Sequence, residues 1–390
     1  MRVIRTVLIV VSLLSFLHAG IFDLIKDIFK PKQNQPQQQQ ERTIQREEPP
    51  SQIEEFPTEN EIIIEEGEEE EQEQVIEKIP FPKYPYSYKI AFILPKKLIG
   101  KYSVTTVNAT IAYLLKREIN FKIDVFDIKD GNFDTLNRVL SKIESRGYHL
   151  VIAPVTRQIA RNICSLYIKK LIYIPTVNKN SLSCDDPNVY FGGIDYNRQF
   201  LALAKRVRDK NAVLVYDTSP FISTLNSFAQ NYFFIKKRII VKDIKNLKNT
   251  ILANKKSLQN STVLLNTPLV KTALLLSDLY FYSIKPKYFL STQINYDPHI
   301  FLLTQYKTRE NMLIANSIFE TYIKYSDASE ILNSNIKFDK VNYATMNGLD
   351  YFFVNSYRDR GRIFKEKVYD NQIYYNIEIV SPVQGKFIRK

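Results

Sequence analysis

The stretch that decides the fold begins with His149-Leu-Val-Ile-Ala153, an apolar run between Gly147 and Pro154. Such a run is typical of a β-strand that is covered on both faces. Residues 157–169 follow with apolar side chains at helical spacing, and residues 171–175 form a second apolar run. A strand, a helix and a strand with short joins predict a right-handed parallel crossover. The loops after both strands therefore leave the sheet at one edge, where open α/β sheets place their ligands.

The same alternation of buried strand and helix continues on both sides of this stretch. Further strands are predicted at residues 88–94, 121–127, 211–216, 238–241, 262–266 and 288–290. Further helices are predicted from residue 103 and at residues 133–146, 196–209, 219–234, 244–255 and 269–284. The alternation predicts an α/β fold with two doubly wound parallel-sheet lobes and a cleft between them.

The last 100 residues are expected to connect and complete the two lobes. Residues 291–306 are predicted to return to the first lobe, and residues 309–325 and 341–357 to be helical. A hairpin is predicted over residues 366–380, with its turn at Asp370-Asn371. The globular body thus spans residues 81–390. Its first lobe covers about residues 88–208 plus part of 300–340, and its second lobe about 210–290 plus part of 340–390.

The first 30 residues resemble an export signal followed by an amphipathic helix. Residues 1–20 carry Arg2 and Arg5, an apolar core, and Leu17-His-Ala19 as a candidate cleavage site, which predicts a secretory signal peptide. An uncleaved membrane anchor is the alternative, while the lack of a cysteine near residue 20 excludes a lipoprotein. Residues 21–30 place apolar side chains on one helical face, which favours either contact with the membrane surface or packing on the body.

Residues 31–80 form an acidic, low-complexity segment. They contain four basic and 15 acidic residues and a Gln run at residues 37–40. High charge with few aromatic residues predicts a disordered linker. The rest of the chain is therefore more basic than the net charge of +13 suggests. Because these basic residues are scattered rather than clustered, and the Lys-, Asn- and Ile-rich composition fits AT-biased coding, we do not expect a nucleic-acid partner.

The sequence contains two cysteines, Cys164 and Cys184. In an exported protein an even pair suggests a disulfide, and here one residue lies on the predicted helix and the other on the loop after the next strand, so they could approach each other. The alternative is one buried and one exposed thiol. The pair lacks Cys-x-x-Cys spacing, so redox catalysis is not expected.

Three short segments of the sequence resemble motifs of a known family. They are Val-Ile-Ala-Pro-Val-Thr at residues 151–156, Ile-Tyr-Ile-Pro-Thr-Val-Asn at 172–178 and Val-Tyr-Phe-Gly-Gly-Ile-Asp-Tyr-Asn-Arg-Gln at 189–199. Their order resembles that of type I periplasmic binding proteins, in the branch of branched-chain amino-acid receptors. Penicillin-binding-protein activators have a similar pair of lobes. The resemblance covers roughly residues 88–390 and implies a periplasmic location.

The resemblance implies a ligand site in the cleft between the lobes. The matching positions are Thr156 and Arg157 in one loop, Thr176 and Asn178 in the next, and Phe221 and Thr267 in two loops of the second lobe. The alternative is that Thr156 and its counterparts cap helices and turns. In the family a second-lobe carboxylate binds the ligand amine, but the matching loop here begins with Thr267 and has no acid. This difference argues against an amino-acid ligand. Arg157 suits a carboxylate or phosphate instead, and the alternative is that Arg157 fills the site and the cleft binds no ligand.

Enzyme motifs are weak in this sequence. Its three histidines are far apart, which supports neither a zinc site nor a histidine-based triad. Ten glycines include no phosphate-binding loop, and Gly192-Gly193 more plausibly marks a close backbone approach. We expect no metal and no cofactor.

The combined features predict a non-enzymatic periplasmic protein of the cell envelope. One hypothesis is an interaction or regulatory module, similar to activators of cell-wall synthesis, in which the linker sets the reach to an envelope protein partner. The alternative is a solute-binding receptor of an ABC-type uptake or sensing system, whose ligand is a small anionic or amino-acid-like molecule. The long acidic linker and the missing second-lobe acid favour the first hypothesis, and the commonest use of the fold favours the second.

Overall fold

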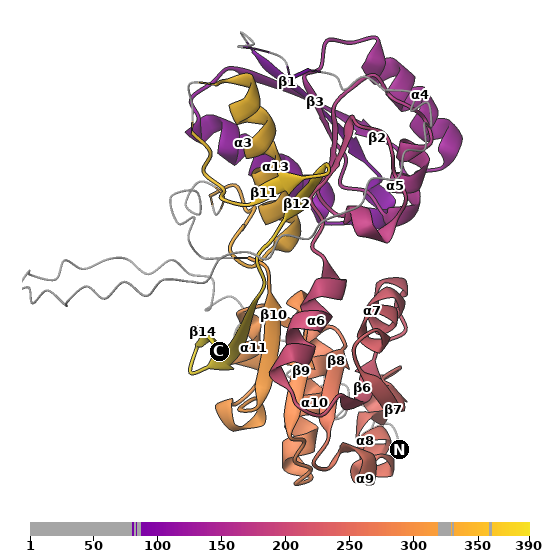
Figure 1. Ribbon diagram of the computed structural model, residues 1–390, viewed down its shortest axis with the longest axis vertical. Coiled ribbons are helices and arrows are strands. Elements are labelled where there is room, and N and C mark those ends of the chain that lie inside the picture. The colour runs from indigo at the N-terminus through magenta and orange to yellow at the C-terminus, as the bar shows by residue number, and fades with distance from the viewer. Residues whose placement is uncertain (1–79, 82, 84–86, 319–328, 330, 359–360) are drawn as a thin grey trace, which may run out of the picture. The chain divides into compact units, whose positions relative to one another are not determined.

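The computed structural model describes residues 80–390 except 82, 84–86, 319–328, 330 and 359–360. The predicted signal peptide, the amphipathic helix and nearly all of the acidic linker lie outside the described residues. In the described part, two sheets of seven strands are each flanked by helices (Figure 1). This arrangement confirms the predicted α/β fold with two parallel-dominated lobes.

The first sheet has the strand order β11-β12-β5-β4-β3-β1-β2. Its strands are β1 (Tyr88–Leu94), β2 (Phe121–Asp127), β3 (Leu150–Ile152), β4 (Ile172–Ile174), β5 (Val189–Phe191), β11 (Lys367–Tyr369) and β12 (Gln372–Tyr374). Its helices are α2 (Lys96–Ile99), α3 (Tyr102–Lys116), α4 (Phe133–Glu144), α5 (Arg157–Cys164) and α13 (Lys340–Ser356). Alternate residues of β1 face opposite ways, so Ile90 and Phe92 join the core beneath α3 and α13, while Ala91 and Ile93 join the core beneath α4 and α5.

The second sheet has the order β14-β13-β10-β9-β8-β6-β7. Its strands are β6 (Asn211–Tyr216), β7 (Phe234–Ile240), β8 (Thr262–Asn266), β9 (Tyr288–Ser291), β10 (Met312–Asn316), β13 (Glu378–Val383) and β14 (Lys386–Arg389). Its helices are α6 (Tyr196–Arg206), α7 (Pro220–Gln230), α8 (Leu247–Ala253), α9 (Lys255–Leu258), α10 (Leu269–Phe281) and α11 (His299–Leu303). Single 3₁₀ turns occur at η1 (Lys179–Ser181), η2 (Ile244–Asn246), η3 (Gln293–Asn295) and η4 (Tyr306–Thr308).

Two predictions for the C-terminal part are wrong. Residues 309–325 were expected to be helical, but β10 occupies Met312–Asn316 and pairs in parallel with β9. Residues 291–306 were expected to return to the first lobe, yet Tyr296 and Ile300 lie in the core of the second sheet. A short apolar run suits either a helix or a strand, and the neighbouring strand β9 decides between them. The predicted helix at 341–357 and the turn at Asp370-Asn371 are confirmed.

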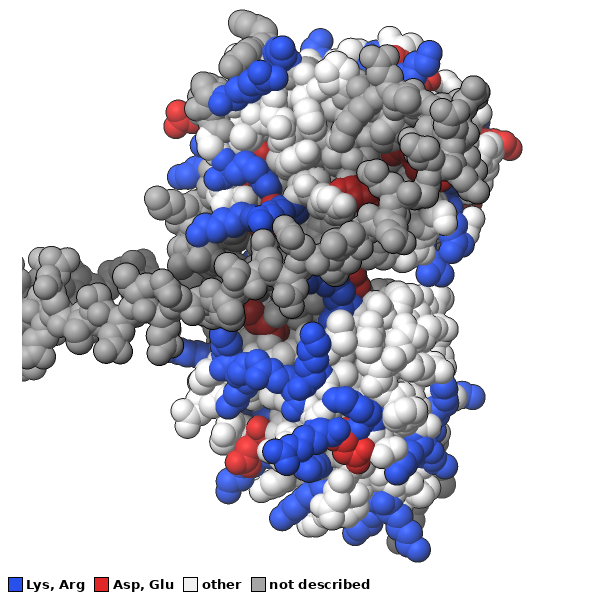
Figure 2. Space-filling view, viewed as in Figure 1, with Lys and Arg blue, Asp and Glu red and all other residues white. Residues whose placement is uncertain are grey.

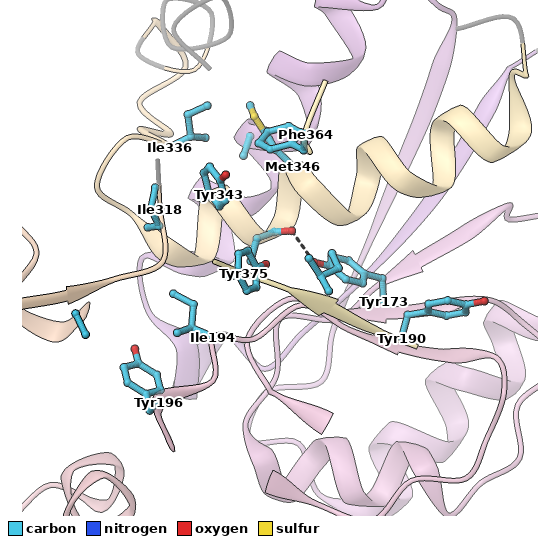
Figure 3. Close-up of a cluster of buried hydrophobic side chains, with 14 of the residues drawn as sticks. Tyr173, Tyr190, Ile194, Tyr196, Ile318, Ile336, Tyr343, Met346, Phe364 and Tyr375 are labelled. Carbon is cyan, nitrogen blue, oxygen red and sulfur yellow. Dashed lines mark hydrogen bonds between the residues drawn. The ribbon is translucent and has the colours of Figure 1, made fainter. Parts of the chain in front are cut away.

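The chain crosses between the lobes where β5 leads to α6, where β10 leads toward α13, and where β12 leads to β13 (Figure 1). One hydrophobic cluster continues through these crossings, and in Figure 3 its side chains run from Tyr190 through Tyr375 to Tyr196. Beside it, the buried Gln199 amide donates to the Ser317 hydroxyl at 2.8 Å. The crossings are therefore packed rather than loosely linked.

Close packing around the buried Tyr173 side chain explains why glycine occurs on both sides of it. Its hydroxyl donates to the Ala344 carbonyl of α13 at 2.5 Å. A Cβ atom at Gly192 would lie 1.8 Å from that hydroxyl oxygen, and one at Gly348 would lie 2.0 Å from the ring. A Cβ at Gly193 would lie 2.3 Å from the Val177 carbonyl carbon, which confirms the close backbone approach predicted for Gly192-Gly193.

A buried ion-pair network ties α3 to α13. Asp350 is fully buried, and its carboxylate accepts hydrogen bonds from Arg117 and from the Tyr113 hydroxyl, both at 2.7 Å. The backbone N–H groups of Ile363 and Phe364 donate to its second oxygen at 2.9 and 3.1 Å. The charge is thus fully hydrogen-bonded, as a buried carboxylate requires.

The half-buried His149 side chain makes the stability of the first lobe depend on pH. Its Nδ1 accepts a hydrogen bond from the Lys89 backbone N–H at 2.9 Å, which requires the neutral ring. Burial lowers the pKa of His149, and the charges of Lys89 and Lys170 lower it further. The pKa of His149 is therefore lower in the folded protein than in the unfolded chain, where it is about 6.5. At a pH between these two values the unfolded chain binds more protons than the folded protein. The free energy of unfolding is thus undiminished above about pH 6.5 and declines as the pH falls toward the folded pKa.

We therefore expect the free energy of unfolding to fall more steeply between about pH 7 and pH 5.5 in the wild type than in His149→Asn, whose amide does not titrate. Urea unfolding of both proteins at each pH measures the difference. Parallel declines in the two proteins would contradict the assignment to His149.

Candidate functional site

A cavity of about 870 Å³ lies between the loops of the first lobe and the first turns of α6 and α7. Its first-lobe lining includes residues 155–158 after β3 and residues 176–178, 180 and 181 after β4. Its second-lobe lining includes residues 219–221 and parts of α7. These segments follow the carboxyl ends of parallel strands, which is where open α/β sheets form ligand sites. The cavity is therefore a cleft between the two lobes.

The loop after β3 contributes Thr156 and Arg157. The Thr156 hydroxyl accepts from the Ile159 backbone N–H at 3.5 Å, so Thr156 caps α5 as well as lining the cleft. Arg157 is the first residue of α5, its side chain is exposed, and it forms no ion pair with another described residue. A guanidinium group at a helix N-terminus suits a ligand carboxylate or phosphate.

The loop after β4 contributes Thr176 and Asn178, whose side chains also hold the loop in place. The Thr176 hydroxyl donates to the Val155 carbonyl at 2.5 Å and so joins the two loops. The Asn178 amide donates to the Gly193 carbonyl at 2.9 Å and accepts from the Asn180 N–H at 3.0 Å. Both residues line the cleft, but their polar groups are already partly satisfied.

The second lobe contributes an aromatic pair, Phe221 and Tyr196. Phe221 is 44% exposed and meets Tyr196 edge-on, with ring centroids 5.3 Å apart. The Lys340 ammonium lies 5.4 and 5.3 Å from the Tyr196 and Phe221 ring centroids. Burial lowers the pKa of Lys340, but the neighbouring Tyr196, Tyr102 and Asp339 outweigh it and raise the net pKa. Lys340 thus keeps its charge at neutral pH and holds the two rings in place.

Thr267 does not line the cleft, in contrast to the prediction. It is fully buried, and its hydroxyl lies 2.7 Å from the Thr272 hydroxyl at the start of α10. The structure therefore brings Thr156, Arg157, Thr176, Asn178 and Phe221 together and leaves Thr267 apart.

Several lining residues were missed by sequence reasoning. They are polar side chains beside the predicted ones, at the start of α6, and along α7 to its C-terminal end, namely Gln158, Asn180, Ser181, Asn197, Ser219, Thr224 and Asn231. The signal that could have found most of them is their position shortly after predicted strand ends, whereas Thr224 and Asn231 depend on how α7 faces the cleft. Asp195, the one acidic lining residue, is occupied as the cap of α6, where it accepts from the Arg198 N–H at 3.0 Å.

The first lobe contains a disulfide between α5 and the loop after β4. Cys164 at the end of α5 is bonded to Cys184 in the loop after β4, with Cα atoms 5.4 Å apart, and both residues are buried. Within the described residues, no group of three His, Cys, Asp or Glu side chains is arranged to hold a metal ion. No described helix combines the length and apolar character needed to span a membrane.

Known proteins similar to this chain were found by comparison of structures and not by comparison of sequences. No family model matches the sequence. No curated protein matches it either. Among solved structures, the chain is similar to the branched-chain amino acid transporter substrate binding protein LivJ from Streptococcus pneumoniae in complex with isoleucine. The TM-score is 0.54 at 8% identity, over 78% of this chain and 100% of LivJ.

Two further structures show the range of proteins with this fold. LpoA of Haemophilus influenzae matches with a TM-score of 0.52 at 11% identity, over 80% of this chain and 59% of LpoA. A solute binding protein of an ABC transporter from R. palustris in complex with benzoate matches with a TM-score of 0.55 at 12% identity, over 78% of this chain and 95% of that protein. The chain thus has the two-lobed fold of type I periplasmic binding proteins, a fold shared by solute-binding proteins and by LpoA.

Proposed function

We propose that this chain is a binding protein whose cleft captures a small organic anion. The observation that carries the proposal is the cavity of about 870 Å³ in which Arg157 is exposed without an ion-pair partner among the described residues. A drug-sized ligand needs a cavity of about 300–1,000 Å³, so this one is large enough.

The lining favours an anion with an apolar body. Arg157 and the N-terminus of α5 supply positive potential, and Val155, Ile194 and Phe221 supply apolar surface. Both carboxylate oxygens of the one acidic lining residue, Asp195, already accept hydrogen bonds, from the Arg198 N–H and from the Asn180 side-chain amide, so a ligand ammonium group would have to compete for them. A carboxylate on an aromatic or aliphatic body therefore fits better than an amino acid, and benzoate, bound by the R. palustris protein, has this chemistry.

We further infer that the protein works outside the cytoplasm. The signal-like pattern of residues 1–20 and the disulfide between Cys164 and Cys184 support this location, because disulfides persist mainly in oxidising compartments.

A second candidate function is an interaction module that acts on an envelope protein. The likeness to LpoA and the acidic segment at residues 31–80 favour it. In that case the cleft would bind no small molecule, and the outer surfaces of the lobes would contact the partner.

A thermal-shift screen of the full chain against carboxylates, including benzoate, and amino acids tests the first candidate. A ligand at 100 times its Kd stabilises the folded state by about 2.7 kcal/mol, which gives a measurable shift in Tm. We expect Arg157→Ala to weaken binding about tenfold or more, because a charge-assisted hydrogen bond is lost.

The matched control is Arg161→Ala, which removes an exposed arginine from the same helix outside the cleft lining. We expect it to bind like the wild type. Equal losses in both variants would place the ligand elsewhere. No shift from any ligand, in protein whose circular dichroism shows it folded, would reject the first candidate in favour of the interaction module.

A further inference from the structure

A second cavity lies at the edge of the second sheet opposite to the cleft. It has a volume of about 760 Å³ and is lined by residues before and at the start of β6, β8 and β9, and by part of β7. The cleft follows the other end of β6, and a strand of six residues separates the two sites by roughly 20 Å. A ligand in this cavity would therefore not touch the cleft.

The cavity, here called the basic pocket, is lined by five cationic side chains and one acidic side chain. The cations are Arg206, Arg208, Lys236, Lys237 and Lys287, all of them exposed, and the acid is Asp209. Figure 2 shows that Lys and Arg also outnumber Asp and Glu over the visible face of this lobe. Arg208 and the three lysines form no ion pair within 4.0 Å with any described acidic side chain.

Asp209 offsets only one of the five positive charges of the lining. It accepts hydrogen bonds from the Asn211 backbone N–H at 2.9 Å and from the Asn211 side chain at 2.7 Å. These hydrogen bonds lower the pKa of Asp209, and the nearby charges of Lys236 and Lys287 lower it further. The pocket therefore keeps an excess of positive charge even with Asp209 ionised.

A β-bulge brings two adjacent lysines to the same pocket. In a regular strand, consecutive side chains point to opposite faces of the sheet, so Lys236 and Lys237 would be separated. Here Ala212 pairs with Ile235 and Val213 pairs with Lys237, which leaves Lys236 as the extra residue of a bulge. Both lysines line the pocket as a result. Bulges of this kind redirect side chains and are frequent beside functional sites.

Neutral donors complete the pocket wall. The Gln259 side-chain oxygen accepts from the Lys285 N–H at 3.0 Å, which leaves its amide N–H groups as donors. Asn260 adopts a left-handed backbone conformation with φ of 56°, and its side chain also lines the pocket. The site therefore combines charged and neutral donors and presents few acceptors.

We propose that the basic pocket binds a ligand that carries two or more phosphate groups. Several cations around one concave site match a compact group with several negative charges better than a single carboxylate. The arginine guanidinium pairs with phosphate oxygens in a bidentate manner, and lysines neutralise the remaining charge. The volume admits a group larger than a single phosphate.

The phosphate groups could belong to a soluble polyphosphorylated molecule or to lipid headgroups at a membrane surface. The position of Phe234 is consistent with lipid headgroups as the source. Its side chain is 73% exposed on the edge strand β7, two residues before Lys236. An exposed aromatic side chain beside basic residues is suited to a lipid–water interface. Binding experiments with two probes separate these sources.

The experiment measures binding of the full chain to inorganic tripolyphosphate by calorimetry, and to phosphatidylcholine vesicles with and without cardiolipin by co-sedimentation. The test variant replaces Lys236, Lys237 and Lys287 by serine. The matched control replaces Lys242, Lys245 and Lys307 by serine, which removes equal charge from exposed positions of the same lobe outside the pocket. Circular dichroism verifies that both variants are folded.

We expect the pocket variant to lose about tenfold or more in affinity for at least one probe, and the control variant to lose about twofold or less. Tripolyphosphate binding identifies a soluble ligand. Binding to cardiolipin vesicles alone, weakened by Phe234→Ser, identifies lipid headgroups. The proposal is overturned if neither probe binds, or if the pocket and control variants lose affinity equally, since that would reflect diffuse charge alone.

Discussion

Replacing Asp350 by alanine is expected to lower the free energy of unfolding by about 3–5 kcal/mol. The substitution leaves the guanidinium of Arg117 buried without its carboxylate at 2.7 Å. It also removes the acceptor for the backbone N–H groups of Ile363 and Phe364. Removing one partner of a buried ion pair is costly because the other charge stays desolvated. Urea unfolding followed by circular dichroism measures the change.

The control for Asp350→Ala is Lys122→Ala. Lys122 and Asp124 form an ion pair at 3.8 Å on the same lobe, and the Lys122 side chain is 63% exposed. Loss of such a surface pair changes the free energy of unfolding by about 1 kcal/mol or less. Equal effects of the two substitutions would show that the Asp350 network does not hold α13 to α3.

The second large effect is expected from removing the disulfide. Replacing Cys164 and Cys184 together by alanine should lower the free energy of unfolding by about 3 kcal/mol, because the bond closes a loop of 20 residues and restricts the unfolded chain. Both positions are buried, so alanine avoids placing a polar group there.

Reduction provides the internal control for this prediction. A reducing agent should bring the wild type close to the stability of the double variant and leave the variant unchanged. Two results would contradict the disulfide. One is the detection of reactive thiols in the folded, oxidised wild type, and the other is equal stability of the two proteins in the absence of reductant.

The cleft could be predicted from the sequence to a larger extent than the basic pocket. Five of the six predicted cleft residues line one cavity because they follow the carboxyl ends of parallel strands, and strand order along the chain predicts that edge. Thr267 also follows such a strand, but its hydroxyl turns to Thr272 and becomes buried. The basic pocket could not be predicted, because its cations are distant in sequence and its bulge depends on how β6 and β7 pair.

The sequence by itself determined the bounds of four strands and the crossover β3–α5–β4. Strands β1, β2, β6 and β8 have the bounds that their composition predicts, and three of them are continuous apolar runs because the sheet is covered on both faces. The local sequence pattern is sufficient to predict a strand where both faces of the sheet are buried, because burial then favours an apolar residue at nearly every position.

Only the tertiary structure decided how the C-terminal part is shared between the lobes. The run at Met312–Asn316 becomes a strand because β9 offers a parallel edge, and α13 packs against α3 because Asp350 meets Arg117. These choices rest on contacts between residues far apart in the chain. Local periodicity carries no information about such contacts, since each segment alone satisfies more than one structure.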